Sequence, residues 1–292
     1  MKLKVAFVDF WGGFDNRFFV WLLKNAGYDV EVVNNFPDLV IHSQFGSHNR
    51  SFSCKKVYYT GENIRALDKG FSMTYDFSDN PAHLRVPLYT LVRWYWANDG
   101  GNLANDPSIT LNTIVTEKNK FKDELLNEKP YFCAFIQSNG TCLHRNEFFQ
   151  KLNARKSVKS AGGFLNNIGL TIAPNKKLEY LKKFKFMITF ENTQQFGYTS
   201  EKIIEPMLVD TIPVYWGSTS VSSEFNSKSF IDANSMSIDD LVNRVLEIDS
   251  DDDLYYQMYK QPHLIDNTLT PWLDFNNISN FFKKIINDEI RL

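Results

Sequence analysis

Residues 190–202 read FENTQQFGYTSEK, and residues 211–218 read TIPVYWGS. This pattern predicts a buried strand that ends at Phe190, a polar loop, a helix that begins near Thr199-Ser200, and a second strand. In a parallel α/β sheet, such a turn brings free backbone N–H groups and the positive end of the helix dipole to the carboxyl edge of the strand. The stretch therefore predicts an α/β fold in which this turn binds an anion.

The residue types in this turn suit a ligand that carries phosphate. Thr199 or Ser200 can cap the helix, and Lys202 then lies in its first turn, where the helix dipole disfavours a cation. A bound phosphate would relieve that conflict. Gly197 allows unusual dihedral angles or the close approach of a ligand. The alternative interpretation is that Glu201 and Lys202 are ordinary solvated charges.

Strand and helix patterns alternate along most of the rest of the chain. Residues 5–10 read as a first strand, and the later alternation is typical of a parallel sheet with crossover helices. Between residues 96 and 129 the composition shifts toward polar residues and Gly100-Gly101, which is typical of a domain boundary. Residues 277–291 read as an amphipathic helix that docks on the body. The predicted parts are an N-terminal Rossmann-like domain over 1–128, a second Rossmann-like domain over 129–262, and a helical tail over 263–292 that packs on the body.

The composition excludes several classes of protein. With 292 residues, 43% of them hydrophobic, the chain can bury a core in each of two domains. A net charge of -2 gives no broad attraction to nucleic acid or anionic lipid. The three cysteines lack CxxC spacing, which argues against a disulfide framework or a zinc site. No apolar run is long enough for a signal peptide or a membrane span. We expect a cytoplasmic protein with at most peripheral contact with the inner membrane.

Several segments together resemble the α1,3/4-fucosyltransferase family (glycosyltransferase family 10), and its shorter bacterial members most of all. The family signature corresponds to Phe190 through Lys202 and to residues 213–217. The resemblance implies a GT-B fold, in which two Rossmann-like lobes face a cleft, and transfer of fucose from GDP-fucose to glycans that contain N-acetylglucosamine. The other similar segments are Thr60-Gly61-Glu62-Asn63, residues 83–89, His144-Arg145-Asn146 and Gly162-Gly163, and the likeness runs from residue 8 to about residue 230.

The resemblance implies that Glu62 is the catalytic base and that the N-terminal domain binds the acceptor. Glu62 follows a predicted strand over residues 57–59, so it is expected at the carboxyl edge of the first sheet. The family converts the β-linkage of GDP-fucose into an α-linkage, and such an inversion needs a base for the acceptor hydroxyl. The alternative is that Glu62 is an ordinary loop carboxylate.

The resemblance also assigns the donor to the second domain. Arg145 and Lys202 are implied to contact the diphosphate oxygens, Arg145 through a planar fork and Lys202 as a compact charge. Asn192 and Tyr198 are implied to bind the donor near phosphate or fucose. Glu201 is implied to accept hydrogen bonds from hydroxyl groups of ribose or fucose.

An acidic run is the one candidate for a metal-binding Asp-x-Asp motif. It covers residues 249–253, reads DSDDD, and follows no apolar strand. A solvated face or a helix cap is therefore the favoured interpretation. We predict no metal site and no cofactor, with GDP-fucose as the donor substrate.

Three aromatic and two histidine positions have both a functional and a structural interpretation. Residues 94–96 read WYW and could stack on acceptor sugars, but consecutive aromatic residues are more typical of a core. His83 and His144 could shuttle protons, although a hydrogen-bonded structural histidine is the more common case.

We therefore expect an inverting, metal-independent α1,3-fucosyltransferase. It would move L-fucose from GDP-β-L-fucose to the 3-hydroxyl of N-acetylglucosamine in N-acetyllactosamine-type glycans and form a Lewis x type product. The expected partners are GDP-fucose and an oligosaccharide or glycolipid acceptor such as lipopolysaccharide, and not nucleic acid. Two alternatives remain: a GT-B transferase that uses another nucleotide sugar, and a non-catalytic glycan-binding protein. A dinucleotide dehydrogenase is excluded because no GxGxxG turn follows an early strand.

Overall fold

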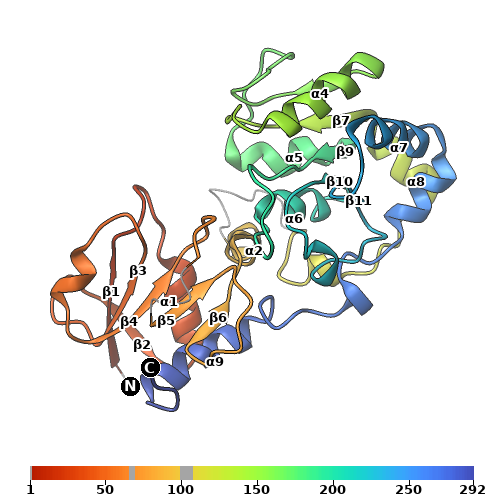
Figure 1. Ribbon diagram of the computed structural model, residues 1–292. Helices are drawn as coiled ribbons and strands as arrows, with labels where there is room; N and C mark the ends of the chain where they lie inside the picture. Colours follow the sequence, from red (N-terminus) through yellow and green to blue (C-terminus); the bar gives the residue numbers. More distant parts are fainter. Residues whose placement is uncertain (1, 66–69, 99–107) are drawn as a thin grey trace. The chain divides into compact units, whose positions relative to one another are not determined.

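The chain divides into two compact units in a computed structural model that describes residues 2–65, 70–98 and 108–292 (Figure 1). The first unit comprises Met1–Leu91 and Leu269–Leu292, and the second comprises Val92–Thr268. Each unit contains a parallel sheet with helices, as the alternating sequence pattern predicts. The glycine pair Gly100-Gly101 of the predicted boundary lies outside the described residues.

The first unit contains a six-stranded sheet in the order β2-β1-β3-β4-β5-β6. All of its neighbouring strands pair in parallel, so their carboxyl ends lie at one edge. Strands β3 and β5 are buried along their whole length, which is typical of a parallel sheet covered on both faces. The strands are β1 (Lys2–Val8), β2 (Asp29–Val32), β3 (Leu39–His42), β4 (Lys55–Tyr59), β5 (Phe71–Thr74) and β6 (His83–Arg85).

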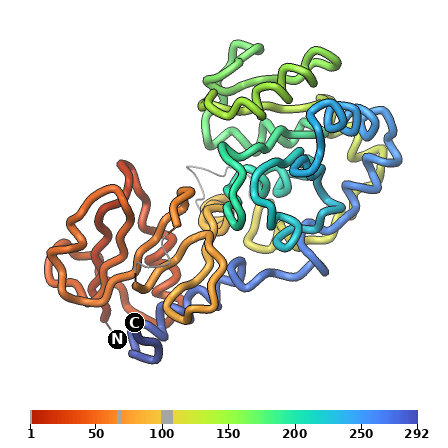
Figure 2. The backbone as a smooth tube through the Cα atoms, viewed as in Figure 1, coloured from red at the N-terminus to blue at the C-terminus, as the bar shows by residue number. Residues whose placement is uncertain are grey.

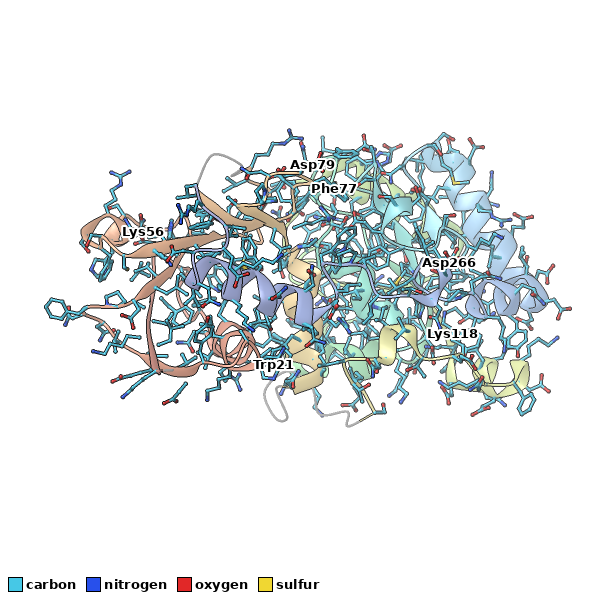
Figure 3. The ribbon with its side chains drawn as sticks, turned by 90° about the horizontal axis from the view of Figure 1, so that it is seen from below. Trp21, Lys56, Phe77, Asp79, Lys118 and Asp266 are labelled. Carbon is cyan, nitrogen blue, oxygen red and sulfur yellow. The ribbon has the colours of Figure 1, made fainter. Side chains whose placement is uncertain are left out.

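Helices α1 (Arg17–Asn25) and α9 (Phe275–Ile286) pack together in the first unit, although they come from opposite ends of the chain. The ring of Phe275 makes edge-on contacts with Phe18 and with Trp21, which Figure 3 labels. Asn25 donates a hydrogen bond to the Ser279 hydroxyl over 3.0 Å. The terminal amphipathic helix therefore docks on the body, as its periodicity predicts. In Figure 2, the blue C-terminal segment ends beside the red N-terminal part of the chain.

The second unit contains a five-stranded sheet in the order β11-β10-β9-β7-β8, again with all neighbours parallel. Its strands are β7 (Tyr131–Phe135), β8 (Val158–Ser160), β9 (Phe184–Ile188), β10 (Ile212–Tyr215) and β11 (Ile231–Asp232). The other helices are α2 (Leu88–Asn98), where the two units meet in sequence, α3 (Lys122–Glu128), α4 (Leu143–Arg155), α5 (Lys177–Leu181), α6 (Glu201–Met207), α7 (Ile238–Ser250) and α8 (Asp252–Tyr259). In the part of the chain that the structure describes, no helix has the length and apolarity needed to cross a bilayer.

The contacts divide the chain differently from the boundaries that the sequence predicts. The second unit begins at Val92 and not at residue 129, because Trp96 and Ile109 pack in the same core cluster as Phe184 of β9. The last residues, from Leu269 onward, belong to the first unit because of the packing of α9 on α1.

Candidate active site

The motif stretch folds in the predicted order of strand, loop, helix and strand. Beyond β9, the backbone stays paired with the next strand, because Glu191 N–H donates to the carbonyl oxygen of Trp216 over 2.8 Å. Helix α6 begins at Glu201, and the Ser200 hydroxyl accepts a hydrogen bond from the backbone N–H of Lys202. Of the two predicted cap residues, Ser200 is therefore the N-cap.

Glu191 is a fully buried carboxylate at the centre of this turn. It accepts hydrogen bonds from the Ser200 N–H and hydroxyl, each over 2.7 Å, and from Lys202 Nζ over 2.9 Å. Gly217 provides the necessary space, since a Cβ atom there would lie 2.4 Å from Glu191 Cγ. Glu191 thus connects the end of β9 to the start of α6. Sequence reasoning assigned it no role, and the only signal was a carboxylate placed directly after a buried strand.

Lys202 is held inside the turn, with 15% of its side chain exposed. Burial opposes its charge, but the carboxylates of Glu191 and Glu201 raise its pKa above the usual value. The ammonium group is therefore charged at neutral pH. The expected conflict with the helix dipole is relieved by the Glu191 carboxylate within the protein, so relief of that conflict does not require a ligand phosphate.

Arg145 lies in the first turn of α4, and its side chain is fully buried. Its Nη1 donates to the carbonyl oxygen of Phe190 over 3.2 Å and to Asn192 Oδ1 over 3.0 Å. Its Nη2 donates to the carbonyl oxygen of Asn139 over 2.5 Å. Burial lowers the pKa of the guanidinium, but arginine remains protonated in proteins. Among the described residues, no carboxylate forms an ion pair with Arg145, so neutral oxygens hold this cation.

The loop before α6 brings Gly197 and Tyr198 to the same place. Gly197 has a φ of +82°, a left-handed conformation that favours glycine, and its N–H donates to the hydroxyls of Ser218 and Ser220. Tyr198 follows it with 9% of the residue exposed. Four of the predicted donor residues, Asn192, Tyr198, Glu201 and Lys202, are thus grouped around this loop, with Arg145 bonded to the first of them.

Glu201 and Lys202 line a hollow of about 400 Å³ in the second unit. Burial alone would raise the pKa of Glu201, but the ammonium groups of Lys202 and Lys177 lower it overall, so the carboxylate is charged at neutral pH. The hollow therefore has hydrogen-bond acceptors and donors of opposite charge on one wall.

Glu62 lies in the first unit, three residues after β4, at the carboxyl edge of that sheet. It is exposed, and its backbone N–H donates to the Thr60 hydroxyl over 3.0 Å. Within the described residues its carboxylate has no hydrogen bond or ion pair. An exposed, unpaired carboxylate can accept a proton from a hydroxyl group that approaches it.

The acidic run and the buried aromatic residues have structural roles. Asp251 caps α8 by accepting hydrogen bonds from the N–H groups of Asp253 and Leu254, each over 3.0 Å. Asp249 and Asp252 form ion pairs with lysines. No cluster of three or more possible metal ligands occurs in the described ranges 2–65, 70–98 and 108–292. The aromatic residues at 94–96 are buried.

The two histidines differ in their surroundings. His83 is buried, with its ring nitrogens 2.9 Å from the Ser72 hydroxyl and 3.0 Å from the Asp76 carbonyl oxygen, and burial lowers its pKa. His144 packs its ring on those of Phe190 and Trp216. His83 is therefore a structural histidine, and His144 is part of the aromatic packing beside Arg145.

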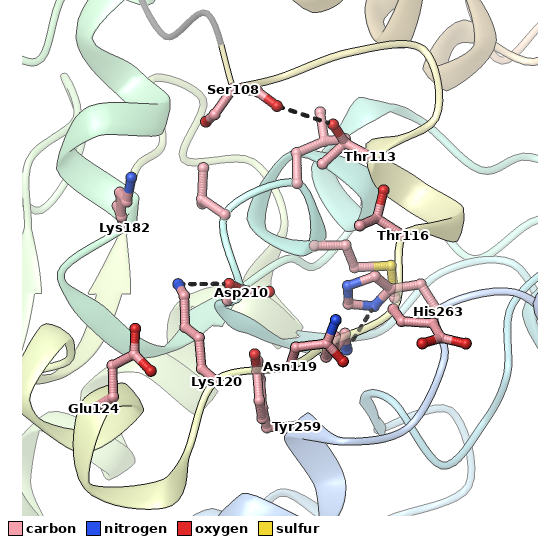
Figure 4. A pocket seen from close by; sticks show the side chains of 15 residues that line it. Ser108, Thr113, Thr116, Asn119, Lys120, Glu124, Lys182, Asp210, Tyr259 and His263 are labelled. Carbon is pink, nitrogen blue, oxygen red and sulfur yellow. Dashed lines mark hydrogen bonds and ion pairs between the residues drawn. The ribbon is translucent and has the colours of Figure 1, made fainter.

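A second hollow, of about 390 Å³, lies elsewhere in the second unit and contains none of the predicted site residues (Figure 4). Lys120 on its wall is paired with Asp210 over 2.9 Å and with Glu128. Lys118 donates to the Gln261 carbonyl oxygen over 2.8 Å and lies 3.4 Å from His263 Nδ1. Burial lowers the pKa of Lys118 to about 7. The charges and hydrogen-bonding groups of these side chains are therefore largely paired within the protein.

Comparison with known families matches both parts of the chain. Residues 126–267 match the family model described as glycosyltransferase family 10 (fucosyltransferase) C-term. Residues 5–92 match the model described as alpha-(1,3)-fucosyltransferase FucT N-terminal domain.

Individual fucosyltransferases are similar to this chain over different shares of its length. The chain is 29% identical to alpha-(1,3)-fucosyltransferase FucT of Helicobacter pylori, in an alignment that covers 98% of this chain and 66% of the relative. It is 28% identical to alpha-(1,3)-fucosyltransferase B of Drosophila melanogaster, over 51% of this chain and 30% of the relative. The chain thus spans just under two thirds of the first relative and less than a third of the second.

Solved structures support the fold. A crystal structure of an alpha1,3-fucosyltransferase with GDP-fucose matches with a TM-score of 0.77 and 27% identity, covering 99% of this chain and 91% of that chain. The Anabaena protein HepE, solved with UDP-glucose, matches with a TM-score of 0.52 and 10% identity, which is a likeness of fold alone. The predicted GT-B class, with two Rossmann-like units, is confirmed by the first match.

Proposed function

Because the chain belongs to glycosyltransferase family 10, we propose that it transfers fucose from GDP-fucose to a glycan acceptor. The observation that supports this most is Arg145, a buried cation with no carboxylate partner among the described residues, bonded to Asn192 in the signature loop. A diphosphate can supply the negative charge that Arg145 lacks. The names of the relatives, alpha-(1,3)-fucosyltransferases, support fucose as the sugar.

In the proposed reaction, the acceptor hydroxyl oxygen attacks C1 of fucose while the bond between C1 and the β-phosphate oxygen breaks. The hydroxyl proton goes to Glu62, and GDP leaves with the electron pair, which inverts a β-linked donor to an α-linked product. Arg145 and Lys202 stabilise the charge that develops on the diphosphate, and no metal is required for this task. Tyr198 and Glu201 orient the donor.

The acceptor in this proposal is an N-acetyllactosamine-type oligosaccharide or glycolipid. Fucose is attached to the 3-hydroxyl of N-acetylglucosamine, which gives a Lewis x type product. The proposed place of action is the cytoplasm or the inner face of the inner membrane. The printed names of the relatives support the α1,3 linkage.

The test is a GDP-release assay with GDP-fucose and N-acetyllactosamine, run with and without EDTA. We expect turnover in both conditions and a loss of at least about a hundredfold in rate for Glu62→Gln, because a general base contributes roughly that much. The control is Glu31→Gln, an exposed carboxylate of the same unit that pairs with Lys2, which should keep the full rate.

Each other result has a defined meaning. Release of UDP from UDP-sugars but not of GDP would identify another donor. Binding of glycans without turnover of any donor would identify a glycan-binding protein. Loss of activity with EDTA would contradict the metal-independent mechanism.

A further inference from the structure

A hollow of about 500 Å³ lies in the first unit, away from Glu62. Most of its lining comes from residues 35–37 and 51–54, which stand just before β3 and β4. These two segments meet because Leu39, at the start of β3, lies opposite Lys55, at the start of β4. The hollow is therefore at the amino ends of these strands, whereas Glu62 follows the carboxyl end of β4. The proposed function uses no residue that lines it.

Phe36 presents an exposed phenyl ring at this hollow. The residue is 90% exposed, and its φ of 51° is a left-handed conformation that costs a residue other than glycine free energy. The loop around it is nevertheless fixed. Pro37 is buried, and Asp38 and Lys4 exchange two hydrogen bonds of 2.8 Å, one to the carboxylate and one to the Lys4 carbonyl oxygen. An apolar ring held at the surface in this way is typical of a binding site and not of a core.

The second segment of the lining is fixed as well. It begins with the short 3-10 helix η1 (His48–Ser51), and the backbone N–H groups of His48 and Asn49 donate to the Asp9 carboxylate, each over 2.8 Å. The rings of His48 and Phe52 lie with their centroids 5.1 Å apart, and both residues line the hollow. Aromatic rings from two separate loops thus line one hollow.

The remaining side chains around the hollow are neutral. Asn35, Ser51 and Ser53 contribute an amide and two hydroxyl groups. None of the described residues that line the hollow is a lysine, an arginine, an aspartate or a glutamate, so a phosphate or an acidic peptide would find no opposite charge there. A neutral sugar has hydroxyl groups that donate to and accept from amides and hydroxyls, and an apolar C–H face that packs on an aromatic ring.

We propose that this hollow is a second glycan-binding site, which holds a neutral sugar of the acceptor chain at a distance from the sugar that receives fucose. The proposal rests on the proposed function, in which the acceptor is a glycan. Between Cys54, on the hollow, and Glu62 the chain follows the whole of β4, which is roughly 15 Å long. An acceptor that occupies both places must therefore be longer than a disaccharide.

The first test compares two acceptors, the disaccharide N-acetyllactosamine and a longer chain of repeated N-acetyllactosamine units, at saturating GDP-fucose. Phe36→Ala should raise the KM for the longer chain roughly threefold to tenfold, because one stacking ring is lost. Its kcat, and its KM for the disaccharide, should stay within about twofold of the unaltered chain. The matched control is Phe121→Ala, which removes a 79% exposed ring in the second unit and should change neither KM.

Two further variants test the nature of the contact. Phe36→Trp keeps an aromatic face and should keep the low KM for the longer chain. Phe36→Leu keeps an apolar side chain without that face and should behave like Phe36→Ala. Because Phe36 is 90% exposed, all three variants should fold, which circular dichroism and thermal unfolding check. A Phe36→Leu variant with an unchanged KM would overturn the stacking contact that the proposal requires.

The results separate this inference from the proposed function. If the unaltered chain turns over no acceptor, the proposed function fails, and calorimetric titration with the longer glycan tests the hollow alone: binding that Phe36→Ala loses supports the site, and no binding overturns it. If the unaltered chain is active and Phe36→Ala has the same KM for the longer chain, only the inference is overturned. An equal rise in KM for both acceptors overturns it too. Analytical ultracentrifugation provides the last check, since a dimer that Phe36→Ala converts to a monomer would make this face a contact between copies instead.

Discussion

At the scale of single residues, the two predicted phosphate-binding cations are held in opposite ways. Lys202 forms an ion pair with the buried Glu191 carboxylate over 2.9 Å. Arg145 is buried against the neutral oxygens of Phe190, Asn192 and Asn139. A carboxylate offsets much of the charge of its partner, whereas a carbonyl oxygen offsets less. Arg145 therefore keeps more of its charge for a bound anion, and Lys202 depends on Glu191 for its position.

Glu191→Gln should destabilise the protein considerably. The amide keeps the size of the side chain but removes the negative charge beside the buried Lys202 ammonium. Loss of one partner of a buried ion pair typically lowers the free energy of unfolding by about 3 kcal/mol or more. Urea unfolding at neutral pH measures this change. The control is Glu179→Gln, which affects the exposed pair with Lys176 and should leave the free energy of unfolding nearly unchanged.

An unchanged free energy of unfolding in Glu191→Gln would show that Glu191 is not the carboxylate that holds the turn.

The motif allowed the positions of Asn192, Glu201 and Lys202 to be predicted, because the end of a strand and the start of a helix are local sequence patterns. It did not predict the role of Glu191, because its burial depends on Gly217 in the next strand connection. Burial of a charged side chain is set by such distant contacts.

At the scale of elements, helix α9 completes the core of the first unit. Phe282 is fully buried, and its ring lies 6.4 Å from that of Phe19 on α1, edge-on. Asp274 caps the helix by accepting a hydrogen bond from the N–H of Asn276 over 2.9 Å. Removal of α9 would therefore expose an apolar face of α1.

Phe282→Ala should lower the free energy of unfolding of the chain by about 3–5 kcal/mol, the usual cost of removing a buried phenyl ring. The measurement is chemical unfolding followed by tryptophan fluorescence, with Trp21 of α1 as one of the reporters. Lys284→Ala, an exposed position on the same helix, should leave stability within about 0.5 kcal/mol. A small effect of Phe282→Ala would mean that α9 does not contribute to this core.

The helix itself was predictable, but its partner was not. Apolar residues at helical spacing indicate an amphipathic helix from the sequence alone. The sequence pattern does not say which surface the helix covers. Asn25 and Ser279 are hydrogen-bonded although most of the chain separates them in sequence. For the same reason, the domain boundary predicted at residue 128 differs from the start of the second unit at Val92. Trp96 donates a hydrogen bond to Glu205, and local composition cannot indicate such a contact.

At the scale of the whole molecule, both parallel sheets carry their predicted site residues after the carboxyl ends of strands. Glu62 follows β4, and Asn192 follows β9. In parallel α/β sheets, site residues generally follow the carboxyl ends of strands. Locating the strands in the sequence was therefore enough to predict this placement. The buried lysines of the second unit were not predicted. Lys129 is 2% exposed, and its ammonium group donates to the Val209 carbonyl oxygen over 2.7 Å and to the Thr211 hydroxyl.

Burial of Lys129 should make the stability of the protein depend on pH in a defined direction. Burial lowers its pKa to about 7 in the folded chain, whereas an unfolded chain has a lysine pKa near 10.4. Between these values the unfolded state binds more protons, so the contribution of Lys129 to the free energy of unfolding rises with pH. Below pH 7 both states are protonated, and the full cost of the buried charge remains. Each pH unit in this window changes the free energy of unfolding by at most about 1.4 kcal/mol.

Urea unfolding at pH 6 and pH 9 should therefore show that the free energy of unfolding of the unaltered chain rises by about 2–3 kcal/mol relative to that of Lys129→Met. The exposed Lys176→Met has no buried charge to relieve and should show a constant difference. A constant difference for Lys129→Met as well would show that the buried ammonium stays charged throughout this range.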